Sequence, residues 1–386
     1  MPLQRPPIRT ILLAPASFKG SLTAREVAEA MAVGVRRRLP DSRITLHPVS
    51  DGGEGLLDVL IPALDGHRVD MMVHGPLPGM RVKAGFGISA DGRAAIVEMA
   101  QAAGLLLISE AERDPCVTTT FGVGELMRAA LDHGVEKLVV GIGGSATNDA
   151  GTGMASALGA RFLDVSGMPL PPGGAALERL ASIHLRDLDP RLSNTTIIVA
   201  CDVQNLLTGP DGAAHVYAPQ KGASPSDVLL LERALGHFAE VVRRTLGKDI
   251  ASIPGGGAAG GLGAGLAAFC GGRLQPGIEV VLDLTGFDAH LREADLVLTG
   301  EGQIDAQTTF GKAPRGVLAR ARAFHKPSAA VVGNIAMDRR RLVGADSFDQ
   351  IVALVDGRTP KEEAIRNARE LVTLRTEELI AMLVPS

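Results

Sequence analysis

The chain has 386 residues, 46% of them hydrophobic, and a formal net charge of -4. This length and apolar content can bury a sizeable core and predict two domains. The negative charge provides no general attraction to nucleic acid or anionic lipid. With no Trp, one Tyr and ten Phe, the chain is also poor in the aromatic residues used for base stacking or membrane anchoring. We therefore expect neither a nucleic-acid partner nor a membrane partner.

Cysteine usage and the N-terminus both predict a cytoplasmic protein. Cys116, Cys201 and Cys270 are odd in number and have no CxxC spacing, which is typical of reduced thiols rather than of a disulfide framework or a zinc site. The apolar run at residues 11–14 is too short for a signal peptide. Residues 254–272 carry no charge, but they are too rich in glycine to predict a membrane span.

The first part of the chain predicts alternating strands and helices. Residues 10–14 form a short buried strand, and Thr23 with Glu26 forms a capping box for a helix that ends at Pro40. A second strand follows at residues 44–49. From about residue 67 short strands follow one another with fewer helices between them, which indicates a second domain. Those strands are predicted at residues 70–73, 82–88 and 94–99.

Regular alternation returns in the last hundred residues. Between residues 100 and 285 the sequence predicts helices at residues 121–133, 151–158 and 226–246 and a strand at 196–200. Ser226 is the predicted cap of the helix at 226–246. The elements predicted after residue 285 are strands at 295–299, 329–333 and 350–355 and a final helix at 362–383.

The predicted fold class is α/β. Both ends of the chain, residues 1–65 and 286–386, form a Rossmann-like, doubly wound parallel sheet domain, and residues 66–285 interrupt it as a second α/β domain. Ligands of such sheets bind at the carboxyl ends of the strands. We therefore expect the active site in the interdomain cleft.

The segment at residues 141–149, GIGGSATND, follows the apolar run 138–140. A strand that stops at clustered glycines and continues as a helix, with Ser145 or Thr147 near its cap, presents backbone N–H groups and a positive dipole end to an anion. Asn148 and Asp149 could in addition hold a cation or a hydroxyl group. An ordinary glycine-rich turn with a good N-cap has the same residue pattern. The segment alone therefore favours neither an anion-binding site nor a plain turn.

Several other segments share one pattern, in which a strand ends, glycines follow and a carboxylate or a lysine lies among them. Carboxylates in such places bind magnesium or accept a proton, and glycines let the backbone approach phosphate oxygens. One such segment alone is most simply a solvated turn, but the repetition favours phosphoryl transfer. The segments are residues 14–20, 51–55, 201–209, 219–222 and 300–312.

The familiar nucleotide-binding motifs give little support to other classes of nucleotide-binding enzyme. The chain has no GxxxxGK[ST] loop, which argues against an ordinary P-loop kinase. Gly255, Gly257 and Gly260 satisfy GxGxxG, but Pro254 precedes them and no clear strand does. A nicotinamide-dependent oxidoreductase remains an alternative, with Glu279 at the distance expected of its acidic residue.

An ordered set of segments resembles the type I glycerate kinases over nearly the whole chain. The segments are APASFKGSLTAREVAEA, DGGEG, GIGGSATNDAGTGMASALGA, CDVQNLLTGPDGAA, PQKGA, PGGGAAGGLGAGLAAF and ADLVLTGEGQIDAQTTFGKAPRGV. This family transfers a phosphoryl group from ATP, with Mg²⁺, to the 2-hydroxyl of D-glycerate, giving 2-phosphoglycerate and ADP. The resemblance therefore implies a cytoplasmic kinase with D-glycerate as its small-molecule substrate and ATP and Mg²⁺ as cofactors.

The resemblance also implies roles for matching residues. Lys19 of SFKG would neutralise charge on the transferred group, and Asp202 and Asp305 would be the catalytic carboxylates. One of the two would orient or deprotonate the 2-hydroxyl and the other would act through Mg²⁺, so both are candidate metal ligands. The predicted substrate- and phosphate-binding residues are Ser17, Asp51, Gly52, Gly53, Glu54, Gly143, Gly144, Ser145, Thr147, Asn148, Asp149, Glu301 and Lys312.

One position departs from the family pattern. The first loop of the family reads APDSFKG, whereas this chain has Ala16 in place of the aspartate. If that aspartate binds metal or substrate, its loss leaves a catalytically weakened binding homologue as a second alternative.

Overall fold

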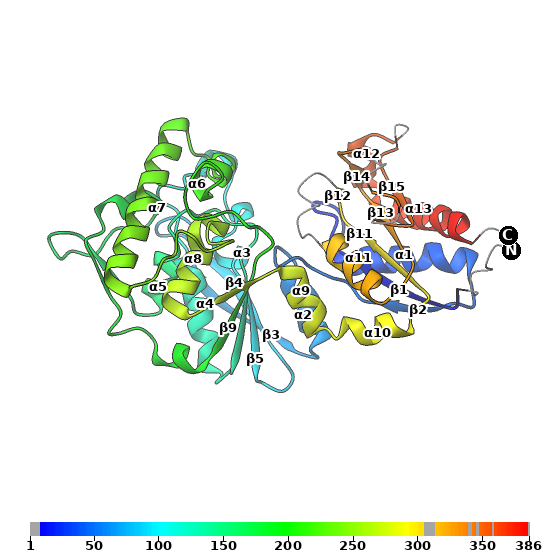
Figure 1. The fold of residues 1–386 in the computed structure, drawn as a ribbon, viewed down its shortest axis with the longest axis horizontal. Coiled ribbons are helices and arrows are strands. Elements are labelled where there is room, and N and C mark those ends of the chain that lie inside the picture. Colours follow the sequence, from blue (N-terminus) through cyan, green and yellow to red (C-terminus); the bar gives the residue numbers. More distant parts are fainter. Residues whose placement is uncertain (1–7, 305–312, 339–341, 345–346, 357–358, 385–386) are drawn as a thin grey trace. The chain divides into compact units, whose positions relative to one another are not determined.

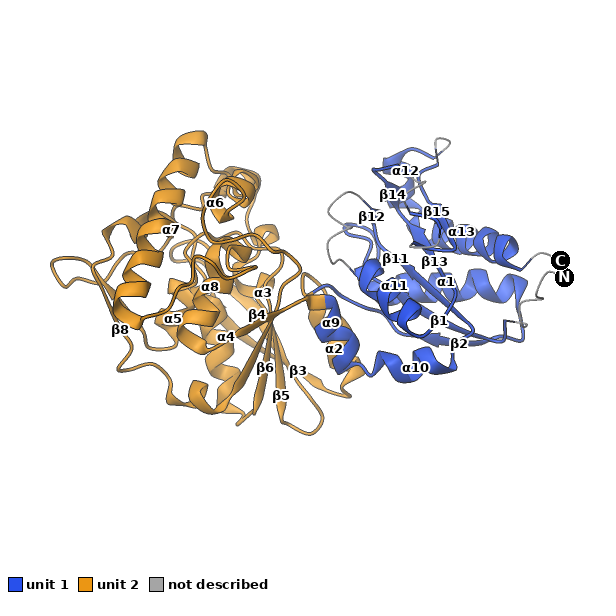
Figure 2. Ribbon diagram, in the orientation of Figure 1, with its two compact units in different colours: residues 1–51, 278–386 blue, residues 52–277 orange. Residues whose placement is uncertain are grey.

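The computed structural model describes residues 8–304, 313–338, 342–344, 347–356 and 359–384 (Figure 1). The chain divides into two compact units (Figure 2). Unit 1 consists of Met1–Asp51 and Ile278–Ser386, and unit 2 is the continuous stretch Gly52–Gly277. Two segments that are distant in sequence thus build one unit, and the middle of the chain builds the other.

The unit boundaries differ from the predicted ones. Helix α2 (Leu56–Ala63) was expected in the first domain, but it packs against β4 and β5 of unit 2. Helix α9 (Gly277–Leu284) was expected in the second domain, yet residues 278–284 belong to unit 1. There Arg320 donates to the carboxylates of Glu279 and Asp283. Each helix is apolar enough to fit either unit, so its packing decides its place.

The five-stranded sheet of unit 1 is parallel throughout. Its spatial order is β15-β13-β11-β1-β2, which in order along the chain is the flavodoxin-like pattern 2-1-3-4-5 of doubly wound sheets. The order reverses between β1 and β11, so the switch point lies beyond their carboxyl ends. The strands are β1 (Thr10–Pro15), β2 (Arg43–Leu46), β11 (Leu296–Gly300), β13 (Ser328–Val332) and β15 (Gln350–Ala353).

Helices cover both faces of this sheet, as its strand sequences require. Along β13, Val331 packs in one apolar cluster with Met31 of α1 and Val372 of α13, whereas Val332 packs in another with Leu318 of α11. Neighbouring strand residues point to opposite faces, so a strand that is apolar throughout must be covered on both. The helices are α1 (Ala24–Arg38), α10 (Phe287–Glu293), α11 (Ala313–Ala323), α12 (Lys361–Arg366) and α13 (Ala368–Leu383).

Local sequence signals place several helix ends correctly. The predicted capping box of Thr23 and Glu26 is present at the start of α1. The helix predicted at residues 362–383 is instead two helices that meet at Asn367. In unit 2, α7 (Pro225–Leu246) begins one residue earlier than predicted, because Ser224 and not Ser226 forms its capping box with Asp227.

Unit 2 contains a six-stranded mixed sheet in the order β10-β9-β6-β5-β4-β3. Strands β3, β4 and β5 pair antiparallel, whereas β5, β6, β9 and β10 pair parallel. The carboxyl ends of these four parallel strands therefore lie along one edge. The strands are β3 (His67–His74), β4 (Arg81–Ile88), β5 (Ala94–Glu98), β6 (Lys137–Gly141), β9 (Thr196–Ala200) and β10 (Arg273–Gln275).

The remaining elements of unit 2 pack around this sheet and form its large apolar core. Two further two-stranded sheets are β7 (Arg161–Leu163) with β8 (Ser182–His184) in unit 2, and β12 (Gln303–Ile304) with β14 (Asn334–Ile335) in unit 1. The other helices of unit 2 are α3 (Ala100–Ala103), α4 (Phe121–Asp132), α5 (Thr152–Ala157), α6 (Ala213–Tyr217) and α8 (Ala258–Cys270).

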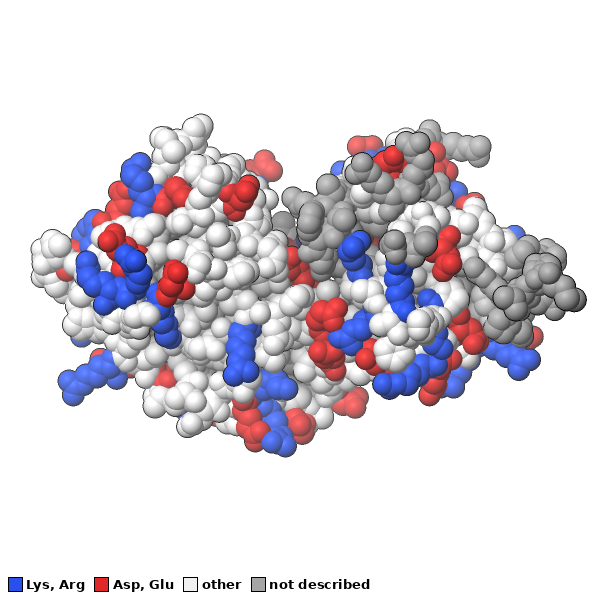
Figure 3. Space-filling view, in the orientation of Figure 1, with Lys and Arg blue, Asp and Glu red and all other residues white. Residues whose placement is uncertain are grey.

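The described surface carries charges of both signs. On the face shown in Figure 3, Lys and Arg side chains alternate with Asp and Glu side chains and form no broad basic area. Within the described residues, every helix is too short or too polar to span a bilayer. The absence of a broad basic area on this face agrees with the small net charge of the sequence.

We expect Gly34→Ala to lower the free energy of unfolding by about 1–3 kcal/mol, because a methyl group there overpacks the contact between α1 and α13. A Cβ atom on Gly34 would lie 2.4 Å from the carbonyl oxygen of Thr373. Gly236 of α7 is the matched control, since a Cβ atom there meets no atom within 4 Å. Gly236→Ala should raise the free energy of unfolding by about 0.5–1 kcal/mol. Urea unfolding followed by circular dichroism measures both, and equal effects would contradict the described packing.

Candidate active site

The switch point of unit 1 brings the loops after β1 and β11 into backbone contact. The N–H of Ala16 donates to the carbonyl of Gly300 at 2.8 Å. A Cβ atom on Gly302 would lie 3.3 Å from the backbone nitrogen of Lys19. Predicted site residues from both ends of the chain, among them Ser17, Lys19 and Glu301, therefore gather at this point. Asp305 and Lys312 lie outside the described residues.

Lys19 is an exposed cation at this switch point. It lies in the turn in which Phe18 is buried and exchanges backbone hydrogen bonds with Leu22. No carboxylate of the described residues forms an ion pair with its ammonium group. An exposed lysine with no carboxylate partner among the described residues suits a phosphate ligand.

In unit 2 the glycines of DGGEG and GIGG bring two loops together over the sheet edge. A Cβ atom on Gly143 would lie 2.6 Å from Cα of Gly53, and one on Gly52 would lie 2.9 Å from Cβ of Ala200. Gly52 also has a positive φ of 87°. Only glycine allows backbones to approach this closely. The two loops therefore meet at the carboxyl ends of β6 and β9.

Glu98 holds the DGGEG loop from below, and sequence reasoning missed it. Its carboxylate oxygens accept the N–H groups of Gly55 and Leu57, each at 3.2 Å. The side chain is 2% exposed, and burial raises its pKa although the two N–H groups oppose the shift. A carboxylate at the end of the otherwise apolar strand AAIVE was the available signal.

Asp202 is held at the same edge of the sheet. Its Oδ1 atom accepts the N–H of Gly277 at 2.7 Å, and it follows β9 by two residues. The neighbouring Cys201 donates its backbone N–H to Gln275 at the end of β10. The carboxylate is thus fixed near Gly52, which lies against Ala200. This position is suitable for a catalytic or metal-binding carboxylate.

The rest of the segment 141–149 differs from the prediction. Strand β6 ends at Gly141, but the next helix, α5, starts only at Thr152, so Ser145 and Thr147 are not near a helix cap. Left-handed residues at Gly144, Ala150 and Gly151 turn the chain in between. Only Gly143 and Gly144 remain accessible, since residues 145–149 are all buried. The anion-binding part of this segment is therefore at most these two glycines.

Asp149 has a structural role. Its carboxylate accepts hydrogen bonds from the backbone and hydroxyl of Thr120 and from the N–H groups of Gly151 and Gly153. The residue is fully buried, and burial raises its pKa. These bonds tie the end of the segment to the starts of α4 and α5. The predicted role of Asp149 as a ligand for a cation or a hydroxyl is not supported by this geometry.

Lys221 of the PQKG segment supports the same loop from inside. Its ammonium donates to the hydroxyl of Ser145 at 2.7 Å and to the carbonyl of Thr147 at 2.6 Å. The side chain is 1% exposed. Burial lowers the pKa of Lys221 from 10.5 to about 7, while the charge of Asp149 acts in the opposite direction. Lys221 was not among the predicted site residues, and it is too buried to touch a ligand.

The structure contradicts the dinucleotide-binding alternative. Residues 247–257 form turns between α7 and α8, so no strand precedes Gly255. A Cβ atom on Gly260 would lie 2.1 Å from the carbonyl oxygen of Thr147, which shows that this glycine serves close packing. Glu279 lies on helix α9 and binds Arg320, whereas a dinucleotide-binding domain has its acidic residue at a strand end.

Comparison with known proteins decides the family. The model of the glycerate kinase family matches residues 11–384. The chain belongs to the glycerate kinase family. It is 45% identical to a glycerate kinase of Halalkalibacterium halodurans, covering 93% of this chain and 97% of that protein. It is 43% identical to a glycerate 2-kinase of Escherichia coli, covering 97% of each chain.

A solved structure agrees with this assignment. The crystal structure of a protein described as a candidate glycerate kinase 2 from Salmonella typhimurium LT2 superposes with a TM-score of 0.85. The two chains are 46% identical, and the match covers 98% of each. The family confirms the predicted kinase class, and the structural match confirms the α/β fold class.

We expect the free energy of unfolding to depend on the protonation of Lys221. Since the folded state lowers its pKa, stabilisation from this group is present above pH 10.5 and is lost as the pH falls to about 7. The Lys221→Met protein should lack this slope, which reaches at most about 1.4 kcal/mol per pH unit. Urea unfolding at about pH 7 and about pH 9 measures the difference. Lys137→Met, in the same unit, is the control, and an unchanged slope in Lys221→Met would contradict the buried charge.

Proposed function

We propose that the protein transfers the terminal phosphoryl group of ATP to the 2-hydroxyl of D-glycerate, giving 2-phosphoglycerate and ADP. The observation that carries the proposal is the pair of loops at the switch point of unit 1, where the exposed Lys19 lies beside the loop of Glu301. In a chain of the glycerate kinase family, this position suits charge neutralisation on a phosphoryl group. The Escherichia coli relative, named a glycerate 2-kinase, supports the choice of hydroxyl.

We assign two tasks to residues of unit 2: binding the anionic groups of the substrates and accepting the proton of the 2-hydroxyl. Gly143 and Gly144 are the accessible residues of their loop; the N–H of Gly143 donates to the carbonyl of Gly52 at 3.4 Å, and we assign the N–H of Gly144 to phosphate or carboxylate oxygens. Asp202, fixed by Gly277, is a candidate to orient the 2-hydroxyl or to accept its proton. Asp305 is the second candidate carboxylate, and it lies outside the described residues.

Magnesium fits the donor chemistry of these residues. Mg²⁺ prefers oxygen ligands and is usually bound by one or two carboxylates together with substrate phosphates and water. Over the described ranges, no group of three or more His, Cys, Asp and Glu side chains is close enough to hold a metal ion. A site built from Asp202 or Asp305 and the phosphates of ATP requires no such group. When bound, Mg²⁺ neutralises charge on the phosphates.

The purified protein should form ADP and 2-phosphoglycerate from ATP and D-glycerate when magnesium is present. A coupled assay for ADP measures the rate, and phosphorus NMR identifies the position of the phosphate. Omitting D-glycerate or chelating magnesium should abolish the signal. A folded protein that forms no ADP under conditions where the Escherichia coli relative is active would overturn the proposal. That outcome would favour the weakened homologue suggested by Ala16.

Asp202→Asn should lower kcat by a factor on the order of 10²–10⁴, as expected when a catalytic proton acceptor or metal ligand is removed. The asparagine carbonyl can still accept the N–H of Gly277, so the fold should survive. Asp211→Asn, at an exposed carboxylate of the same loop region, is the control and should leave kcat unchanged. A near-normal rate in Asp202→Asn would show that Asp202 is not catalytic.

A further inference from the structure

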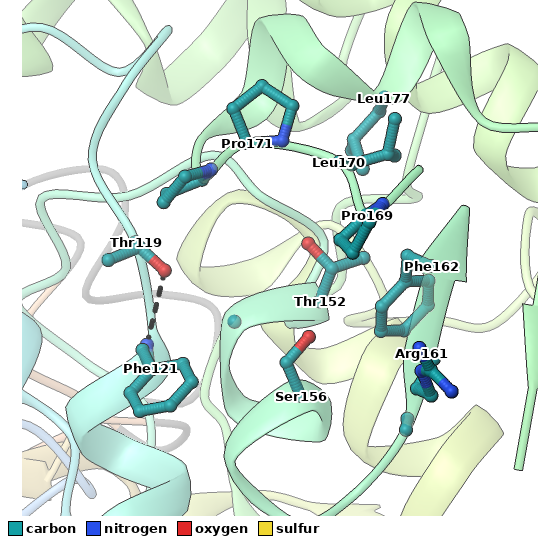
Figure 4. A pocket seen from close by; sticks show the side chains of 13 residues that line it. Thr119, Phe121, Thr152, Ser156, Arg161, Phe162, Pro169, Leu170, Pro171 and Leu177 are labelled. Atoms are coloured by element: carbon teal, nitrogen blue, oxygen red, sulfur yellow. Dashed lines mark hydrogen bonds between the residues drawn. The ribbon is translucent and has the colours of Figure 1, made fainter. Parts of the chain in front are cut away.

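Unit 2 contains a pocket that the assignments above do not use. It has a volume of about 280 Å³ and opens between α5 and the chain that follows β7 (Figure 4). Phe162 of β7 and Phe121 at the start of α4 contribute aromatic rings to its lining. The other apolar side chains that line it include Pro169, Leu170, Pro171 and Leu177. Such a lining favours a flat or compact apolar group.

Polar groups lie at one side of this apolar lining. Figure 4 shows the hydroxyls of Thr119, Thr152 and Ser156 on the side of α4 and α5. In the part of the chain that the structure describes, the Ser156 hydroxyl has no hydrogen-bond partner and the exposed Arg161 forms no ion pair. The pocket thus combines apolar walls with a hydroxyl and a guanidinium group available to a ligand.

The size and chemistry of the pocket select among the components of the proposed reaction. Pockets for small molecules usually measure about 300–1,000 Å³, so 280 Å³ holds a ring system rather than a whole nucleotide. D-glycerate is polar throughout and would not benefit from walls of proline, leucine and phenylalanine. A purine base has apolar faces and polar edges, and it matches both parts of the lining.

The pocket is also tied to the loop that we assign to phosphate binding. Thr119 and Thr152 line the pocket, and their hydroxyls donate to the side chain and the backbone carbonyl of Asp149 at 3.3 and 2.8 Å. Asp149 ends the segment that begins with the accessible Gly143 and Gly144. One continuous segment of the same unit therefore joins the pocket to the glycines.

We propose that this pocket binds the purine base of the ATP substrate, with the phosphates directed toward Gly143 and Gly144. The proposal rests on the proposed function, since it assumes that ATP is the phosphate donor. It adds a nucleotide subsite made by Phe121, Ser156, Arg161 and Phe162, none of which was among the predicted site residues.

Filling the pocket tests the proposal. In Ser156→Phe, a half-buried position on α5 receives an aromatic ring, and the KM for ATP should rise by about tenfold or more, since about 1.4 kcal/mol of binding corresponds to a factor of ten. The KM for D-glycerate and the kcat at saturating ATP should stay within about twofold, because only ground-state binding of ATP is lost. Val165→Phe adds the same ring at a site that is 91% exposed and should change none of these constants.

Arg161→Ala is a second variant that keeps the test valid if Ser156→Phe fails to fold. Arg161 is exposed, so its replacement should not disturb the core, and we expect the KM for ATP to rise. Circular dichroism checks the fold of each variant, and calorimetric titration with ADP measures nucleotide binding without turnover. Folded pocket variants that keep the wild-type KM for ATP and affinity for ADP would overturn the pocket assignment and leave the kinase proposal intact. An inactive wild type that binds ADP, with loss of binding in these variants, would overturn the kinase proposal and support the pocket.

Discussion

The contact between glycine backbones over the sheet edge of unit 2 is the constraint on which the candidate site depends. A Cβ atom on Gly143 would lie 2.6 Å from Cα of Gly53, and one on Gly141 would lie 2.5 Å from the carbonyl oxygen of Gly52. These distances exclude any larger residue. As a result, the chain that enters unit 2 lies directly over the ends of β6 and β9, and Asp202 is fixed within the same small area.

Buried charged groups support this arrangement without contacting a ligand. Glu98 binds two N–H groups at the start of α2, Asp149 joins the starts of α4 and α5, and Lys221 holds Ser145 and Thr147. Burial of each group disfavours its charged form, as the shifts of the pKa values show. Hydrogen bonds to backbone atoms offset part of that cost and give the loops a single geometry. The side chains of Ser145 and Asp149 in GIGGSATND therefore stabilise the loop and do not face a ligand.

Much of the fold could be predicted, because its signals are local. The capping box of Thr23 and Glu26 marks the start of α1, and the apolar runs mark β1, β6 and β9 at nearly the observed positions. The site was predictable in part, since glycines and carboxylates after strands indicate loops at a sheet edge. Glu98 was missed, and Lys221 was singled out only with its PQKG segment and not for its role, because one charged residue in an apolar strand or a short turn does not reveal its partners.

The sequence by itself determined the α/β class, the strand and helix periodicity and the set of loops that marks the family, because these depend on residue type and spacing alone. The tertiary structure decided which polar side chains of a loop face outward. The sequence predicted Ser145 and Asp149 as ligand-binding residues. In the structure both are buried, in contact with Lys221 and Thr120, which are distant from them in sequence. Such contacts form between segments whose proximity depends on the whole fold, so no local pattern encodes them.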